Sequence, residues 1–192
     1  MMREVDVMRT YVVLIAVLAA VLGAASLQAK ELVISPSKVE AIVSPTNAGD
    51  SRVLVYFELP KELYGKKVVI DNAALVFEAQ VTDAEFGMVH IFPATRAWQT
   101  EASVAWSSPW EKAGGDFTQR IAGKCVTLKA AKGEEEISSD VTFIVMDWIS
   151  GRLENNGFIL VPSQEDLADS AAGFVFDKSS LKLKIEFTKQ DR

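Results

Sequence analysis

Apolar and polar residues alternate along most of this chain with a period of two, and this pattern constrains the fold more than any other feature. The alternation recurs from Arg52 to the end of the sequence. Successive side chains of a β-strand point to opposite faces of a sheet, so this period indicates strands with one buried face. The clearest example lies near the C-terminus, where polar residues separate Leu181, Leu183, Ile185 and Phe187.

Nine or ten short strands are predicted, each bounded by Gly, Pro, Asn, Asp or Ser. They cover residues 31–35, 38–43, 53–59, 75–81, 88–92, 124–129, 158–161, 173–176 and 181–187, with a turn expected at Asp71-Asn72. Many short strands with turn signals between them are typical of an all-β protein with an antiparallel β-sandwich or jelly roll.

One segment departs from the two-residue period and predicts a short helix. The helical spacing i, i+3, i+4, i+7 is occupied by Val141, Ile144, Val145 and Trp148. Asp140 is a residue type that caps helix N-termini, and Gly151 stands where a left-handed residue ends many helices. We therefore expect a helix over residues 140–150 that lies across the sandwich with its apolar stripe in the core.

The N-terminal segment has the order of a signal peptide. Two arginines precede an uncharged run from Tyr11 to Ala25. This run reaches about 22 Å as a helix, short of the ~30 Å bilayer core, and it ends in small residues. We expect residues 1–29 to be a signal peptide, with cleavage after Ala25 or Ala29, and an uncleaved anchor is the alternative. Residues 30–192 then form a single domain, secreted to the extracellular space or the periplasm without stable membrane insertion.

Charge and cysteine content narrow the possible partners. The formal net charge is −6, and this acidic balance argues against binding to nucleic acid or anionic lipid. Cys125 is the only cysteine, so an intrachain disulfide is excluded. We expect it to be a small buried residue of a strand, and a reactive thiol is the alternative.

Two acidic segments, residues 133–136 and 164–169, are expected to be solvated turns. A structural calcium ion is the alternative, because carboxylates and loop carbonyls are the ligands this cation prefers. Neither segment has the alternating oxygen-ligand spacing of an EF-hand, so the sequence gives no count of calcium ligands, and no other cofactor is predicted.

Motifs for catalysis are missing from the sequence. With His90 as the single histidine and one cysteine, there is no His-pair metal site and no obvious Cys-His dyad. Neither a nucleophile elbow nor a phosphate-binding glycine loop occurs. Ser35 and Lys38 have the spacing of a Ser-x-x-Lys motif, but a proline follows the serine. We predict that the protein is not an enzyme, although paired carboxylates for glycoside hydrolysis stay open because their separation is a three-dimensional property.

The tryptophans are candidates for sugar binding, because an exposed indole face stacks on a sugar ring. Trp148 lies on the helical stripe, so it is expected in the core. Trp110 instead lies among Ser, Pro, Gly and charged residues. We predict that Trp110 is an exposed carbohydrate-binding platform, with Tyr64 as a second one.

The order and spacing of several short motifs resemble those of the DNRLRE domain, an exported β-sandwich found on microbial surface proteins. The resemblance covers residues 51–187 and rests on Phe57-Glu58-Leu59-Pro60, Ala97-Trp98 through Trp106, Gly114-Gly115-Asp116-Phe117, Asp140 through Trp148, and Asn156-Gly157-Phe158. The chain departs from the pattern at Phe176-Asp177-Lys178, where the family has an Arg-Glu pair. The resemblance implies a fold similar to carbohydrate-binding modules. It also implies that Trp98 and Trp106, which bracket a short turn in a structural motif of the family, lie in the core.

Two functions follow from this resemblance. The first is a non-catalytic module that binds an extracellular or cell-surface polysaccharide. The second is a structural subunit of a cell surface or extracellular matrix, without a glycan ligand. A solvent-facing cluster of aromatic and polar side chains on one sheet would favour the first, and a long unpaired strand edge or a large apolar patch would favour the second.

Overall fold

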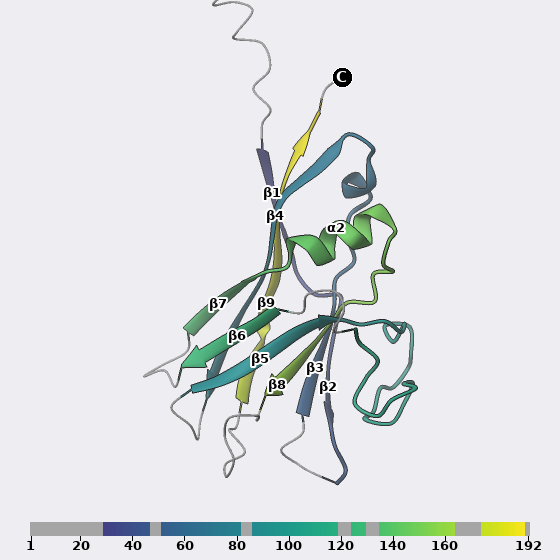
Figure 1. Cartoon of the computed structure of the whole chain (residues 1–192), viewed down its shortest axis with the longest axis vertical. Helices are drawn as coiled ribbons and strands as arrows, with labels where there is room; N and C mark the ends of the chain where they lie inside the picture. The colour runs from purple at the N-terminus through teal and green to yellow at the C-terminus, as the bar shows by residue number, and fades with distance from the viewer. Residues whose placement is uncertain are drawn as a thin grey trace, which may run out of the picture.

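The computed structural model describes residues 29–46, 51–81, 86–118, 124–129, 135–163 and 174–190. These residues form an all-β sandwich with one short α-helix, which confirms the expected fold class (Figure 1). The elements are β1 Ala29–Ile34, β2 Lys38–Val43, β3 Ser51–Tyr56, the 3-10 helix η1 Lys61–Tyr64, β4 Val68–Val81, β5 Phe86–Pro93, β6 Lys124–Lys129, β7 Glu135–Asp140, α2 Thr142–Ser150, β8 Phe158–Ser163 and β9 Phe174–Lys189.

The strands form two antiparallel sheets. The four-stranded sheet has the order β1-β9-β4-β7, and the five-stranded sheet has the order β2-β3-β8-β5-β6. In Figure 1 the two sheets form two layers, with α2 lying across one end of them. Two sheets packed face to face bury one face of each strand, and this explains the period-two alternation of the sequence.

The main core lies between the two sheets and under α2. Its rings are in contact, because Phe158 packs against Phe57 with ring centroids 6.3 Å apart and against Trp148 with centroids 4.7 Å apart. Full burial of one such side chain contributes about 1.5–3 kcal/mol. The largest buried members include Phe57, Leu63, Leu75, Phe77, Ile91, Ile144, Phe158 and Phe187.

Helix α2 is close to its predicted position. Val141, Ile144, Val145 and Trp148 are buried as expected. Gly151 ends the helix in the left-handed region with φ 74°, and its N–H donates to the carbonyl oxygen of Trp148. The predicted N-cap is displaced by one residue, since Val141 holds that position. Asp140 still accepts a hydrogen bond of 2.9 Å from the N–H of Thr142.

The turn predicted at Asp71-Asn72 is wrong, because both residues lie inside the long strand β4. The pairing of β4 with β9 shifts between Ile70 and Asn72, so the chain makes a β-bulge there instead of reversing. Both residues point to solvent. A polar, turn-like dipeptide therefore marks an irregular position in an exposed part of a continuous strand.

Strand β9 joins two predicted strands into one. A second irregularity in its pairing with β4 lies between Val76 and Glu78. Polar side chains satisfy the backbone there, because the N–H of Glu78 donates to Ser180 Oγ at 2.7 Å and the N–H of Ser179 donates to Asp177 Oδ1 at 2.8 Å. Hydrogen bonds from Ser179 lower the pKa of the Asp177 carboxyl.

Strand β7 was not predicted. It contributes a single buried apolar side chain, Ile137, while Glu136 and Ser138 are exposed, so its sequence has no run of apolar alternation. The predicted solvated turn over residues 133–136 is therefore wrong for Glu135 and Glu136, which begin the strand. Among the described strands, β7 lies at one edge of the four-stranded sheet, where it pairs with β4.

Other predictions concern residues outside the described parts of the chain. These are the signal peptide up to residue 28 and the acidic segment 164–169. Cys125 lies on β6, the strand predicted for it, but its side chain is not among those described. Within the described residues, no helix has the length and apolar character needed to cross a membrane.

Candidate functional site

The segment of residues 94–118, called here loop 94–118, packs on the outer face of the five-stranded sheet. Strand β3 is buried on both faces, since Val53 and Val55 point into the main core and Leu54 points outward. Loop 94–118 covers the outward side chains and forms a second apolar cluster with them. The buried members of this cluster are Ile42, Leu54, Ala94, Trp98, Trp110 and Ile159.

Trp98 anchors the start of the loop. Its side chain is fully buried, as expected, and its indole N–H donates to the carbonyl oxygen of Asn156 at 2.7 Å. Lys38 of β2 holds the next turn, because its Nζ donates to the carbonyl oxygen of Glu101 at 2.7 Å and lies 5.5 Å from the Trp98 ring centroid. These contacts fix the loop against β2 and against the segment that leads into β8.

The predicted exposure of Trp110 is wrong. Only 7% of this residue is exposed, and its indole N–H donates to the carbonyl oxygen of Ala105 at 2.9 Å. The surrounding Ser, Pro and Gly residues correctly indicated a loop, but the loop folds back on the sheet and buries its large apolar ring. Trp110 therefore offers no open face for a sugar.

Tyr64 is 48% exposed, as predicted for a surface residue. It lies on η1, and burial of its hydroxyl raises its pKa, with a smaller contribution from Tyr56. Trp106, predicted to be in the core, is half-buried at the edge of the second cluster. The structure does not bring Tyr64 and Trp110 together as one binding surface.

Three rings on the outer face of the sheet form what we call the aromatic wall: His90, Phe92 and Phe117. The rings of His90 and Phe92 stack with centroids 5.8 Å apart and planes 6° apart, and those of Phe92 and Phe117 stack at 4.7 Å and 17°. His90 and Phe92 share a face of β5 because they are two residues apart. A bridge between Ala94 and Phe117 places the third ring beside them. All three side chains are half-buried.

Arg52 of β3 connects the aromatic wall to the rest of the loop. Its guanidinium carbon lies 4.8 Å from the Trp106 ring centroid and 5.3 Å from that of Phe117, distances typical of cation–π contacts. Its Nη1 also donates to the carbonyl oxygen of Gly114. Arg52 thus fixes the position of Phe117 from below the loop.

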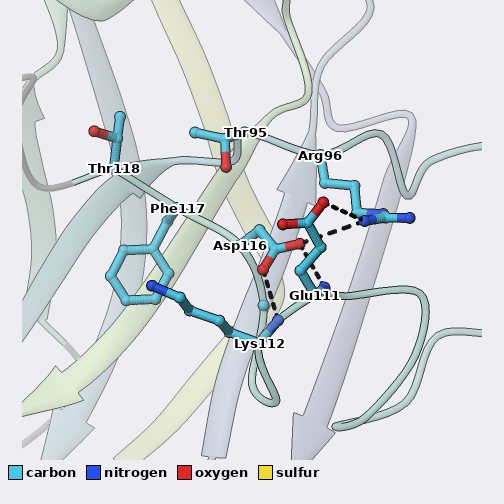
Figure 2. A pocket seen from close by; sticks show the side chains of 8 residues that line it. Thr95, Arg96, Glu111, Lys112, Asp116, Phe117 and Thr118 are labelled. Carbon is cyan, nitrogen blue, oxygen red and sulfur yellow. Dashed lines mark hydrogen bonds and ion pairs between the residues drawn. The ribbon is translucent and has the colours of Figure 1, made fainter.

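A groove with a volume of about 630 Å³ lies next to the aromatic wall (Figure 2). Phe117 belongs to both features. The remaining lining residues are mostly polar or charged: Thr95, Arg96, Glu111, Lys112, Gly115, Asp116 and Thr118.

Asp116 organises the polar side of the groove. Its carboxylate oxygens accept hydrogen bonds from the backbone N–H groups of Glu111, at 2.8 Å, and Lys112, at 2.9 Å. Arg96 Nη1 lies 3.3 Å from Glu111 Oε1 and 4.0 Å from Asp116 Oδ2. Figure 2 shows Lys112 extending on the other side of the groove, toward Phe117 and away from Arg96. Donors and acceptors therefore stand side by side next to an apolar ring.

Metal binding has no support in this part of the chain. Among the described residues, no group of three or more His, Cys, Asp or Glu side chains is arranged to hold an ion. The predicted alternative of a calcium ion at residues 164–169 concerns a segment outside the description.

Most residues of the groove were missed from the sequence. His90 was expected to be structural, and Phe92 and Phe117 were not considered as ligand contacts. The alternation along β5 contains a usable signal, because His90 and Phe92 must point away from the buried Val89 and Ile91. No comparable signal exists for the Arg96–Glu111 pair, which the loop brings together.

Comparison with models of protein families gives no match for this chain, and comparison with curated proteins gives none either. The similarity to the DNRLRE domain therefore rests on the short motifs alone.

Proposed function

We propose that this protein is an exported, non-catalytic module that binds an extracellular or cell-surface polysaccharide in the groove beside loop 94–118. The observation that carries the proposal is the half-exposed aromatic wall next to side chains that donate and accept hydrogen bonds. The uncharged run near the N-terminus and the motifs similar to the DNRLRE domain support the exported location and the ligand class.

The chemistry of the groove matches a sugar ring, which has apolar C–H faces and a rim of hydroxyl groups. The part of the Phe117 ring that Phe92 and Arg52 leave exposed offers apolar contact for the C–H groups. Arg96 and Lys112 offer donors, and Glu111 offers an acceptor, for the hydroxyl groups. A single ring in a surface groove gains little free energy, so we expect dissociation constants from micromolar to millimolar, about −8 to −4 kcal/mol.

A structural subunit without a glycan ligand is the second candidate. Val33 on β1 and Val43 on β2 are each about half exposed on edge strands, as a surface for strand pairing would require. However, each of these edges is only six residues long and carries lysine and glutamate side chains, which oppose edge-to-edge association. The polysaccharide-binding function is therefore favoured.

The proposal is tested by screening the purified protein against a panel of polysaccharides by affinity electrophoresis. Substitution Phe117→Ala is expected to weaken retention about tenfold, which corresponds to about 1.4 kcal/mol. Phe143→Ala is the matched control, because Phe143 is a phenylalanine on α2 that is 70% exposed and lies away from the groove. The melting temperature of both variants separates loss of contact from loss of folding. If no polysaccharide retains the wild-type protein, the structural-subunit function takes precedence.

A further inference from the structure

The charges that line the groove balance one another. Arg96 and Lys112 each contribute a positive charge, and Glu111 and Asp116 each contribute a negative charge. Arg52 does not add an accessible charge, because its guanidinium lies against Trp106 and Phe117 and donates to the carbonyl oxygen of Gly114. The groove therefore has no net attraction for a polyanion.

The Arg96 guanidinium already has carboxylate partners. It lies between Glu111, whose side chain is 82% exposed, and Asp116, whose oxygens also accept two backbone N–H groups. A uronate or sulfate group that approached Arg96 would have to share its guanidinium with Glu111 and lie close to the carboxylates of Glu111 and Asp116. Repulsion between like charges opposes that arrangement. The net charge of −6 adds a repulsive field over the whole molecule.

Neutral sugars suit the same arrangement better. Each hydroxyl group both donates and accepts hydrogen bonds, so two neighbouring hydroxyls match a guanidinium donor 3.3 Å from a carboxylate acceptor. A carboxylate or sulfate group itself accepts hydrogen bonds only, so where it faces this pair it offers Glu111 no donor and adds a like charge. The side-by-side order of donor and acceptor is therefore selective for uncharged diols.

We propose that the groove selects neutral polysaccharides with neighbouring hydroxyl groups over polyuronates and sulfated polysaccharides, with the Arg96–Glu111 pair as the element that determines this selectivity. This inference rests on the proposed function. It adds the class of ligand, which neither the fold nor the motifs assign.

The test measures affinity for a neutral hexose polymer and for a polyuronate at about 20 mM and about 500 mM salt. The wild-type protein should bind the neutral polymer with less than about twofold change between the two salt concentrations, because no charge is paired on binding. It should not bind the polyuronate. Substitution Glu111→Lys should weaken binding of the neutral polymer about tenfold and create salt-sensitive binding of the polyuronate.

Glu154→Lys is the matched control. It makes the same change in net charge at an exposed glutamate outside the groove. It should leave the affinity for the neutral polymer unchanged and create no polyuronate binding, and equal behaviour of the two variants would overturn the role of the Arg96–Glu111 pair. If the wild-type protein binds only the polyuronate, or binds both polymers equally tightly, the inference is overturned and the proposed function still stands. Binding to neither polymer, nor to any other polysaccharide in the panel, would remove the proposed function itself.

Discussion

Two glycines with nearly the same positive φ provide a matched test of the fold beneath the groove. Gly151 at the end of α2 has φ 74°, and Gly157 before β8 has φ 78°. A Cβ atom added at Gly151 meets nothing within 4 Å, whereas one added at Gly157 lies 2.2 Å from the Val55 carbonyl oxygen and 3.0 Å from the Tyr56 Cα. Alanine at either site is placed in the left-handed φ region, and only Gly157→Ala adds a clash with the backbone of β3.

The size of the difference follows from these distances. The left-handed conformation costs an alanine about 1–2 kcal/mol at either site. Forcing an extra carbon into packed structure costs about 1–3 kcal/mol more, so Gly157→Ala should lower the free energy of unfolding by about 2–5 kcal/mol in total. Each kcal/mol shifts the melting temperature of a domain of this size by about 2–4 °C. Gly157→Ala should therefore melt about 2–12 °C below Gly151→Ala.

Scanning calorimetry of the two variants measures this difference directly. The clash in Gly157→Ala should move the backbone at residues 156 and 157 away from β3. The Gly157 carbonyl accepts the N–H of Ala94 at 2.9 Å, and the Asn156 carbonyl accepts the Trp98 indole N–H, so this movement should also disturb loop 94–118. Tryptophan fluorescence of Gly157→Ala should accordingly shift to longer wavelength, and that of Gly151→Ala should not. Equal melting temperatures for the two variants would show that β3 does not approach Gly157 closely.

Three further outcomes are expected. Trp110→Ala should lower the free energy of unfolding by about 3–5 kcal/mol, because the ring is buried, and an unchanged melting temperature would contradict its place in the second cluster. Trp148→Ala should lower the free energy of unfolding by a similar ~3–5 kcal/mol. Trp148→Phe should lower it much less, because within the described structure the buried indole N–H makes no hydrogen bond that the substitution could remove, and calorimetry of the two variants measures the difference. Asp177 has a pKa below its ordinary value of 3.8 in the folded state, so its carboxylate stabilises the fold above that pH, and this stabilisation is lost as the pH falls through the folded pKa. Asp177→Asn should therefore reduce the loss of stability at acid pH in a curve of unfolding free energy against pH, and an unaltered curve would contradict the link.

The parts of the fold that were predicted correctly have signals that are local in sequence. The apolar alternation of β9 and the four-residue stripe of α2 each report a buried face directly, because the side-chain period matches the geometry of the element. Strand β7 has only Ile137 as a buried apolar residue, so no period exists to be read. The dipeptide Asp71-Asn72 was misread for a related reason, since an exposed bulge and a turn favour the same polar residues.

The candidate site depends on contacts that are distant in sequence. Loop composition showed that Trp110 lies in a loop, but composition does not report what the loop packs against. One signal was present in β3, where Val53, Leu54 and Val55 are consecutive apolar residues. A strand with apolar residues on both faces must be covered by other residues on both faces. No helix or further sheet was predicted that could cover the outer face of β3. Such a run therefore favours a long loop folded on the outer face, and loop 94–118 is that cover.

Loop 94–118 has buried side chains that hold it on the sheet and exposed side chains that line the groove. Substitutions in the two sets therefore separate effects on stability from effects on binding. Trp98 and Trp110 point toward the sheet and are buried, while Arg96, Glu111 and Lys112 are exposed at the groove. Substitution of exposed residues usually changes the free energy of unfolding by less than about 0.5 kcal/mol, whereas truncation of a buried tryptophan removes several kcal/mol. The buried set thus maintains the surface on which the exposed set is displayed. Loss of binding in a variant of the buried set reports collapse of this surface, whereas loss of binding in a variant of the exposed set reports recognition of the ligand.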